Sequence, residues 1–221
     1  APLLLVRATD AYAKGGFASL VLDGKRQLVE QYGPSSAYWI AQGAGVDPVV
    51  SGAVQAGLLD LAQHHHALAQ SGGAASERDA AIRWYGLYLE GFDASPQAPA
   101  TRMLLADLLF EGQRFETAAI EYERVAYDYN GNPDAARAGY AALFAYAQAE
   151  ANIPEPERAA LARRAIESSL RFADTFPDHA EATGVLARTA KALFDAGDRE
   201  RAESVYGVAV MAYVNLSSMV A

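Results

Sequence analysis

The sequence predicts an all-α protein built from antiparallel helical hairpins that stack on one another. Helical periodicity of the apolar residues runs through nearly all of the 221 residues, and no stretch alternates as a β-strand does. Alanine is abundant and β-branched residues are sparse, which favours helix. Gly, Pro and Asn divide the chain into about eleven helices with short connections. Helices joined in this way pack antiparallel to their neighbours.

The first 75 residues are expected to form divergent helical hairpins. A glycine pair at 15–16 separates the first two helices. A short helix is predicted over residues 37–42. Asp47, followed by proline, predicts the N-cap of a helix that runs to about Gln70.

Residues 76–221 are expected to form more regular hairpins. Ser76, with Asp79 three residues later, predicts a capping box at the start of the next helix. The later breaks between helices are predicted at Ser95-Pro96, Gly112, residues 130–133, residues 153–156, Phe176-Pro177 and Gly197-Asp198.

Two of these hairpin segments resemble one another in sequence. Residues 108–119 and 192–203 each end an apolar helix, turn through a glycine and open a second helix with a small residue on it. Residues 10–17 are a weaker copy. Small residues such as Ala118 and Ala202 let two helices approach closely, and large residues fill the space between hairpins. One hairpin cannot bury its apolar face alone, so the hairpins are expected to stack.

The spacing of matched alanines supports a repeat. Ala81 and Ala118 are 118 − 81 = 37 residues apart, and Ala165 and Ala202 are 202 − 165 = 37 apart. The interval from Ala118 to Ala165 is 165 − 118 = 47, and a proline-containing insert at 153–156 accounts for the excess. Helical hairpin repeats have periods of roughly 34 to 47 residues.

The pattern resembles the tetratricopeptide repeat. Its residues are the Gly112 turn, the aromatic Phe115, the small Ala118, Tyr122 four residues on, and a closing aromatic-proline pair such as 176–177. The resemblance is good over residues 77–214 and weaker over 1–70. It implies one continuous right-handed α-solenoid. The long second helices are similar to the repeats of outer-membrane-protein assembly lipoproteins and of periplasmic proteins that work with the Tol–Pal system.

This resemblance implies a non-enzymatic scaffold that binds a partner protein or peptide in the concave groove, in the bacterial periplasm or at the outer membrane. First-helix residues on the groove side are the candidates, although they could equally contact the next repeat. The candidate groove residues are Met103, Asp107, Phe110, Tyr140, Phe144, Lys191 and Phe194.

Other kinds of function are not expected. The formal net charge of −9 is unsuited to nucleic acid, and no apolar run is long enough to cross a bilayer. Residues 64–66 are three histidines on a predicted helix, where their rings fan out and cannot meet on one metal. No phosphate-binding loop, nucleophile motif or convergent carboxylate pair is recognisable. We therefore expect no catalytic residue, metal or cofactor.

Two alternatives stay open from the sequence. The chain could be a structural spacer or oligomerisation segment without a groove ligand, and the absence of cysteine suits the cytoplasm as well as the periplasm. The helix predicted over about 199–219 is apolar where a solenoid usually ends in a polar cap. We expect an exposed apolar patch there, used by further repeats of a longer parent protein or by self-association.

Overall fold

The computed structural model describes residues 1–155 and 157–219, and over these residues it holds eleven α-helices, one 3-10 helix and no β-strand. The prediction of an all-α protein is therefore confirmed. The chain divides into two compact units, residues 1–112 and 113–221. The expected sequence boundary at residue 75 and the single continuous solenoid stay predictions.

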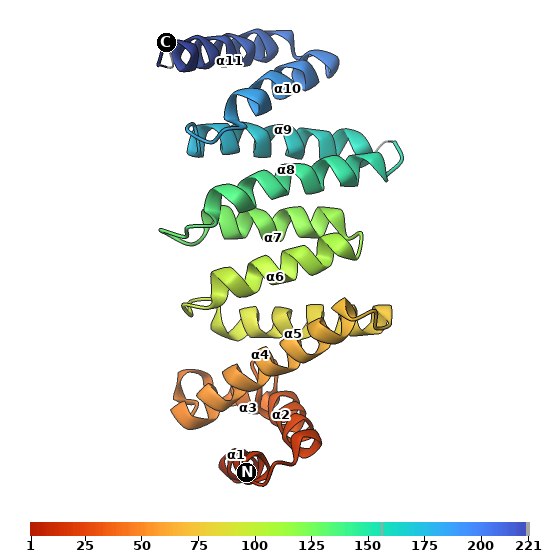
Figure 1. Ribbon diagram of the computed structural model, residues 1–221, viewed down its shortest axis with the longest axis vertical. Helices are drawn as coiled ribbons and strands as arrows, with labels where there is room; N and C mark the ends of the chain where they lie inside the picture. The colour runs from red at the N-terminus through yellow and green to blue at the C-terminus, as the bar shows by residue number, and fades with distance from the viewer. Residues whose placement is uncertain (156, 220–221) are drawn as a thin grey trace. The chain divides into compact units, whose positions relative to one another are not determined.

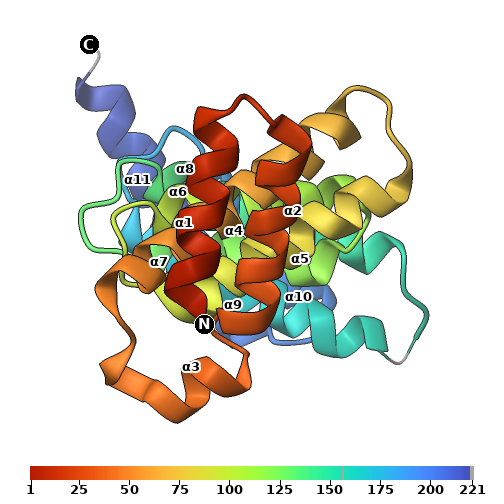
Figure 2. The same cartoon turned by 90° about the horizontal axis from the view of Figure 1, so that it is seen from below.

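Unit 1 contains the first six helices. Each of the longer helices packs on the next one along the chain, α1 on α2, α2 on α4, α4 on α5 and α5 on α6 (Figure 1). The short α3 and the 3-10 helix η1 form a loop that projects beside this stack (Figure 2). The ring of Trp39 in α3 meets Phe92 edge-on at 5.7 Å, which fastens the loop to the end of α5. The bounds are α1 Pro2–Lys14, α2 Ala18–Tyr32, α3 Ala37–Gln42, η1 Gly43–Gly45, α4 Pro48–Gln70, α5 Ala75–Phe92 and α6 Ala98–Glu111.

Unit 2 contains the remaining five helices in the same sequential arrangement. α7 packs on α8, α8 on α9, α9 on α10 and α10 on α11 (Figure 1). Consecutive helices therefore pack pairwise in both units, as hairpins do. The bounds are α7 Phe115–Tyr127, α8 Ala135–Ala151, α9 Glu157–Thr175, α10 Ala182–Asp195 and α11 Arg199–Met219.

Three hairpin turns share one hydrogen-bond pattern. In each turn a backbone N–H donates to the carbonyl five residues earlier, and the residue before the donor is a glycine with positive φ. Gly16, Gly72 and Gly197 have φ of 76°, 87° and 85°, which glycine adopts without the steric cost of a Cβ atom. The bonds run from Phe17 to Tyr12 at 3.0 Å, from Gly73 to Leu68 at 3.0 Å and from Asp198 to Leu193 at 2.9 Å.

The repeat predicted from the sequence is present in the helix bounds. α6 and α10 are offset by the same number of residues at both ends, 182 − 98 = 84 and 195 − 111 = 84. The helices that follow them, α7 and α11, also begin 199 − 115 = 84 residues apart. Residues that differ by 84 therefore occupy matching positions along these helices.

The helix caps follow the sequence in one place and depart from it in another. The Asp47 carboxylate accepts a hydrogen bond from the Val49 N–H at 2.8 Å, so α4 begins and ends as predicted. The expected cap at Ser76 is wrong, because α5 begins at Ala75 and its N-cap residue makes no side-chain hydrogen bond. The first turn of α5 is instead tied to α4 through Glu77, whose Oε2 lies 2.6 Å from Nδ1 of His65.

A close approach joins the first two helices of unit 1. A Cβ atom at Gly24 of α2 would lie 2.5 Å from Oγ1 of Thr9 on α1. Both residues are buried, and the Thr9 hydroxyl donates to the Leu5 carbonyl at 2.9 Å. The absence of a side chain at Gly24 therefore sets the separation of α1 and α2.

A buried polar cluster joins the first three helices of unit 2. The Glu123 carboxylate of α7 accepts hydrogen bonds from the Tyr146 hydroxyl of α8 at 3.2 Å and from the Ser168 hydroxyl of α9 at 2.5 Å. Burial raises the pKa of Tyr146, and the Glu123 carboxylate raises it further. Glu123 thus satisfies two hydroxyl groups that packing removes from water.

The apolar patch expected on the C-terminal helix is present over the described side chains. On α11, Tyr206, Val208, Val210, Met211 and Val214 are all exposed. Within the described residues no helix is both long and apolar enough to span a membrane.

Candidate functional site

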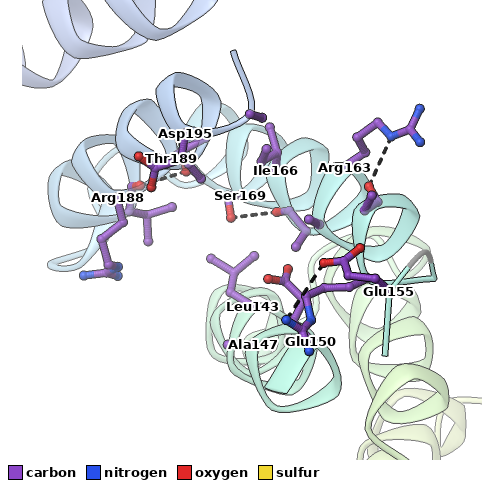
Figure 3. Close-up of a pocket in the computed structure, with 17 residues that line it drawn as sticks. Leu143, Ala147, Glu150, Glu155, Arg163, Ile166, Ser169, Arg188, Thr189 and Asp195 are labelled. Carbon is purple, nitrogen blue, oxygen red and sulfur yellow. Dashed lines mark hydrogen bonds and ion pairs between the residues drawn. The ribbon is translucent and has the colours of Figure 1, made fainter. Parts of the chain in front are cut away.

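Unit 2 contains a pocket of about 820 Å³ between α8, α9 and α10 (Figure 3). Its walls come from the second half of α8, the first half of α9 and the face of α10 opposite them. It is lined by Leu143, Ala147, Glu150, Glu155, Arg158, Ala159, Ala162, Arg163, Ala165, Ile166, Ser169, Val185, Arg188, Thr189, Ala192, Asp195 and Ala196. Apolar side chains supply most of this lining, and small alanines predominate among them.

The α8–α9 connection borders the pocket through Glu155. α8 ends at Ala151 and α9 begins at Glu157, so this connection is longer than the three glycine turns described above. It contains Pro154, whose backbone has no N–H to donate to a tight turn.

The two hydroxyl groups in the pocket are already engaged by their own helices. Ser169 Oγ donates to the Ala165 carbonyl at 2.8 Å, and Thr189 Oγ1 donates to the Val185 carbonyl at 2.8 Å (Figure 3). Such bonds to the preceding turn leave the hydroxyl proton occupied. The pocket floor therefore favours apolar groups over ligands that need a hydroxyl donor.

Charges of both signs surround this floor. Arg158 donates to the Ile153 carbonyl at 2.8 Å, and Arg163 donates to the Ala159 carbonyl at 3.2 Å, so both guanidiniums help to hold the pocket wall. Arg188 lies at 4.0 Å from the Glu181 carboxylate, an exposed pair worth about 0 to 1 kcal/mol. This long exposed pair leaves the Arg188 guanidinium able to bind a carboxylate of a partner.

Three carboxylates line the pocket, Glu150 and Glu155 near the end of α8 and Asp195 on α10. Burial raises the pKa of the Glu150 carboxyl, and the Arg158 guanidinium opposes this rise. Raising the pKa means that the folded chain disfavours ionised Glu150. The associated stability is present below the ordinary carboxyl pKa and is lost as the pH rises through the folded value. A cation placed beside Glu150 by a partner would offset this cost at neutral pH.

The three candidate groove residues of unit 1 lie on α6. Met103 is buried, so it offers no surface to a partner. Asp107 and Phe110 are partly exposed on the same helix. Their role in binding stays a prediction.

The four candidates of unit 2 fall into two environments. Tyr140 packs in an aromatic cluster, with its ring 5.9 Å from Phe172 and 5.5 Å from His179, so its visible role is structural. Phe144 and Phe194 are exposed on α8 and α10. Lys191 is exposed as well and pairs with Asp195 at 2.6 Å.

None of the seven candidates lines the pocket. The sequence reasoning missed this site because it searched for large residues on one side of each first helix. Alanines and ordinary surface charges make the pocket, and they carry no motif.

The histidine run is part of the packing between α4 and α5. His65 pairs with Glu77, and Nδ1 of His66 lies 3.2 Å from the Tyr85 hydroxyl on α5. No group of three potential metal ligands occurs among the described residues.

No protein-family model and no curated protein sequence matches this chain.

Proposed function

We propose that this protein is a non-enzymatic scaffold that holds a segment of a partner protein in the pocket between α8, α9 and α10. The observation that carries the proposal is the make-up of this pocket. A floor of small apolar side chains, with its hydroxyls already bonded, is surrounded by three carboxylates and three guanidiniums. Such a surface suits apolar side chains of a peptide flanked by charged residues.

The size of the pocket supports a peptide segment. A volume of about 820 Å³ accommodates two or three side chains, and it lies within the roughly 300 to 1,000 Å³ typical of ligand sites. The raised pKa of Glu150 favours a partner that brings a lysine or arginine beside it. We propose that the bound segment combines apolar side chains with at least one cation.

We also propose that the helical hairpins form a right-handed solenoid of the tetratricopeptide type. The offset of 84 residues between α6–α7 and α10–α11, together with the repeated left-handed glycine turns, supports it. On this proposal the exposed Phe144, Lys191 and Phe194 belong to the groove side of first helices and extend the partner surface. The envelope location comes from the same resemblance, and the cytoplasm is the alternative.

A structural spacer or oligomerisation segment is the second candidate function. The exposed apolar side chains of α11 favour it, because such a surface suits assembly. In that case the pocket has no partner.

A comparison of two alanine variants on one helix tests the scaffold proposal. Ala162 lines the pocket, whereas Ala160 is exposed on the other side of α9. Each is replaced by Phe, and the whole chain is used to capture proteins from extracts of the source organism. A discrete protein retained by the wild type and by Ala160→Phe, but lost by Ala162→Phe, supports the pocket.

Two further results separate the alternatives. Equal capture by both folded variants rejects the pocket as the site. In that event a Phe110→Ala/Phe194→Ala double variant tests the groove residues instead. If the chain captures only further copies of itself, this result supports the spacer function. Circular dichroism verifies that each variant is folded.

A further inference from the structure

Glu150 differs from the other two carboxylates of the pocket because it has no partner of its own. Asp195 pairs with Lys191 at 2.6 Å, and Glu155 lies 3.9 Å from the Arg158 guanidinium. Among the described residues, none forms a hydrogen bond or an ion pair with Glu150. The pocket therefore contains one carboxylate that is free to bind a cation.

Burial makes this carboxylate costly to ionise. Glu150 is partly buried, and burial raises the pKa of its carboxyl more than the Arg158 guanidinium lowers it. Arg158 is held elsewhere, since its Nε and Nη2 atoms both donate to the Ile153 carbonyl, at 3.2 and 2.8 Å. Arg158 thus offsets only part of the cost, and a second cation beside Glu150 would offset more of it.

The end of α8 adds to the demand for positive charge. Glu150 lies in the last turn of this helix, which ends at Ala151. The carbonyl groups at a helix C-terminus carry the negative end of the helix dipole, and a basic side chain in the last turn commonly meets it. α8 has no basic residue in its last turn. The helix and the carboxylate therefore favour a cation at the same place.

The surface that leads to Glu150 is apolar and consists of small residues. Leu143 and Ala147 precede Glu150 by seven and three residues, so the three lie along one side of α8 (Figure 3). Across the pocket, α9 contributes Ala159 and Ala162. A cation that reaches Glu150 along this surface therefore needs an aliphatic stem that the alanines can cover.

We propose that the pocket binds an ammonium group on an aliphatic stem, and that Glu150 is the residue that recognises its charge. This inference rests on the function proposed for the pocket and names the chemistry that the pocket selects. Lysine suits the site better than arginine, because its charge is compact and its stem is flexible, whereas a guanidinium binds as a planar fork. A lysine of a partner segment and a free alkylamine both carry this group.

Hexylammonium is the probe, and hexanol is its neutral counterpart of nearly the same shape. Each is titrated into the full chain at neutral pH, and the NMR signals of alanine methyl groups in the pocket report Kd. We expect hexylammonium to bind about tenfold or more tightly than hexanol, because only the cation forms a charge-assisted hydrogen bond with Glu150. Glu150→Gln should remove this difference while it retains the shape of the side chain.

A matched variant controls for the loss of one negative charge. Glu157 is an exposed carboxylate in the first turn of α9 and does not line the pocket. Glu157→Gln should leave Kd for hexylammonium within about twofold of the wild-type value, because solvent screens an exposed charge. Ala162→Phe should abolish the binding of both probes, because its ring fills the pocket. Circular dichroism verifies that each variant is folded.

The carboxyl group of Glu150 gives a second readout. NMR of the chain with labelled glutamate carboxyls measures the pKa of Glu150, and Glu150→Gln assigns its signal. Bound hexylammonium should lower this pKa, because a neighbouring cation favours the ionised form. Hexanol fills the apolar floor without a charge and should not lower it.

Two alanine-based peptides distinguish the sources of the ammonium group. One has a central lysine, and the other has norleucine in its place. Tighter binding of the lysine peptide than of hexylammonium identifies a protein segment as the source. Binding of hexylammonium without binding of the lysine peptide identifies a free amine.

Three outcomes overturn the proposal. They are equal affinity of the wild type for hexylammonium and hexanol, undiminished affinity of Glu150→Gln for hexylammonium, and no saturable binding of any probe. Protein capture separates such a failure from failure of the proposed function. If Ala162→Phe loses the captured protein and Glu150→Gln keeps it, the pocket holds a partner that Glu150 does not recognise. If Ala162→Phe also keeps it, the pocket is not the partner's site.

Discussion

Gln113 adopts the same left-handed backbone conformation as Gly197, its equivalent 84 residues further along the chain. The φ angles are 60° and 85°, and Gln113 is the one residue other than glycine with positive φ among the described residues. A Cβ atom makes this conformation unfavourable. Three hairpin turns have glycine at this position, at residues 16, 72 and 197, whereas the turn at 113 has glutamine. Gln113 therefore has a positive φ although glutamine prefers a negative one.

Replacing Gln113 with glycine is expected to stabilise the protein. Relief of the left-handed strain should raise the free energy of unfolding by about 0.5 to 1 kcal/mol, after the added flexibility of the unfolded chain is counted. The reciprocal Gly197→Gln should lower it by about 1 kcal/mol. Urea unfolding followed by circular dichroism measures both. A destabilising Gln113→Gly would contradict this account of the turn.

The contact between Gly24 and Thr9 predicts a non-additive pair of mutations. Gly24→Ala should destabilise the protein by about 1 to 2 kcal/mol, because the new methyl group meets Thr9 Oγ1 and forces the helices apart. Adding Thr9→Ala removes the obstacle, and the double variant should recover most of that loss. A double-mutant cycle in thermal or urea unfolding measures the coupling. Purely additive effects would show that the two residues are not in contact.

The Glu123 cluster predicts a loss of stability when its acceptor is changed. Glu123→Ala leaves the hydroxyls of Tyr146 and Ser168 without their acceptor and should cost about 1 to 3 kcal/mol. Glu167→Ala is the control, since Glu167 forms an exposed pair with Arg201 and should change stability by less than about 1 kcal/mol. Equal losses in the two variants would argue against a structural role for the cluster.

Tyr127 predicts a change of stability at alkaline pH. Burial raises the pKa of Tyr127 to about 12, with Arg171 opposing the rise and Glu123 adding to it. Because the folded value exceeds the ordinary value of 10.0, the associated stability is present below pH 10 and is lost as the pH rises towards 12. Tyr127→Phe should flatten this loss, as measured by unfolding at a series of pH values.

The same variant is expected to be harmless at neutral pH. Tyr127 Oη is buried and has no hydrogen-bond partner within the described part of the chain, so removing it avoids the cost of an unpaired polar group. Tyr88→Phe is the contrast, because the Tyr88 hydroxyl bonds to Gln55 at 3.1 Å and to Ser95 at 2.7 Å. A large destabilisation by Tyr127→Phe alone would reveal a partner for its hydroxyl.

Local signals predicted the helices well where the residue type determines the backbone. Asp47 with Pro48 marked the start of α4, and glycine at 72 and 197 marked two hairpin turns. The capping box predicted at Ser76 was wrong, because α5 begins at Ala75 without a side-chain cap and its first turn is tied to α4 through Glu77. The break between α6 and α7 was predicted from Gly112, but the residue with positive φ is the neighbouring Gln113, and glutamine by itself does not favour this conformation.

The candidate site was the less predictable part. Whether a helix face is open depends on how far its neighbours diverge, and one sequence does not report that angle. Phe110 and Phe194 differ by the offset of 84 residues, yet Phe110 is partly buried and Phe194 is exposed. The pocket is lined by alanines such as Ala147 and Ala162. Alanine is common in every helix, so it does not indicate a binding site.

The pocket between α8, α9 and α10 is tested most directly by site-specific photo-cross-linking in living cells of the source organism. A photoreactive amino acid replaces Ala147 inside the pocket in one strain and Ala160 outside it in another; both positions are exposed on helices of unit 2. The account predicts a discrete cross-linked partner from position 147 and none from position 160. The absence of any cross-link at 147, or the same product from both positions, would contradict it.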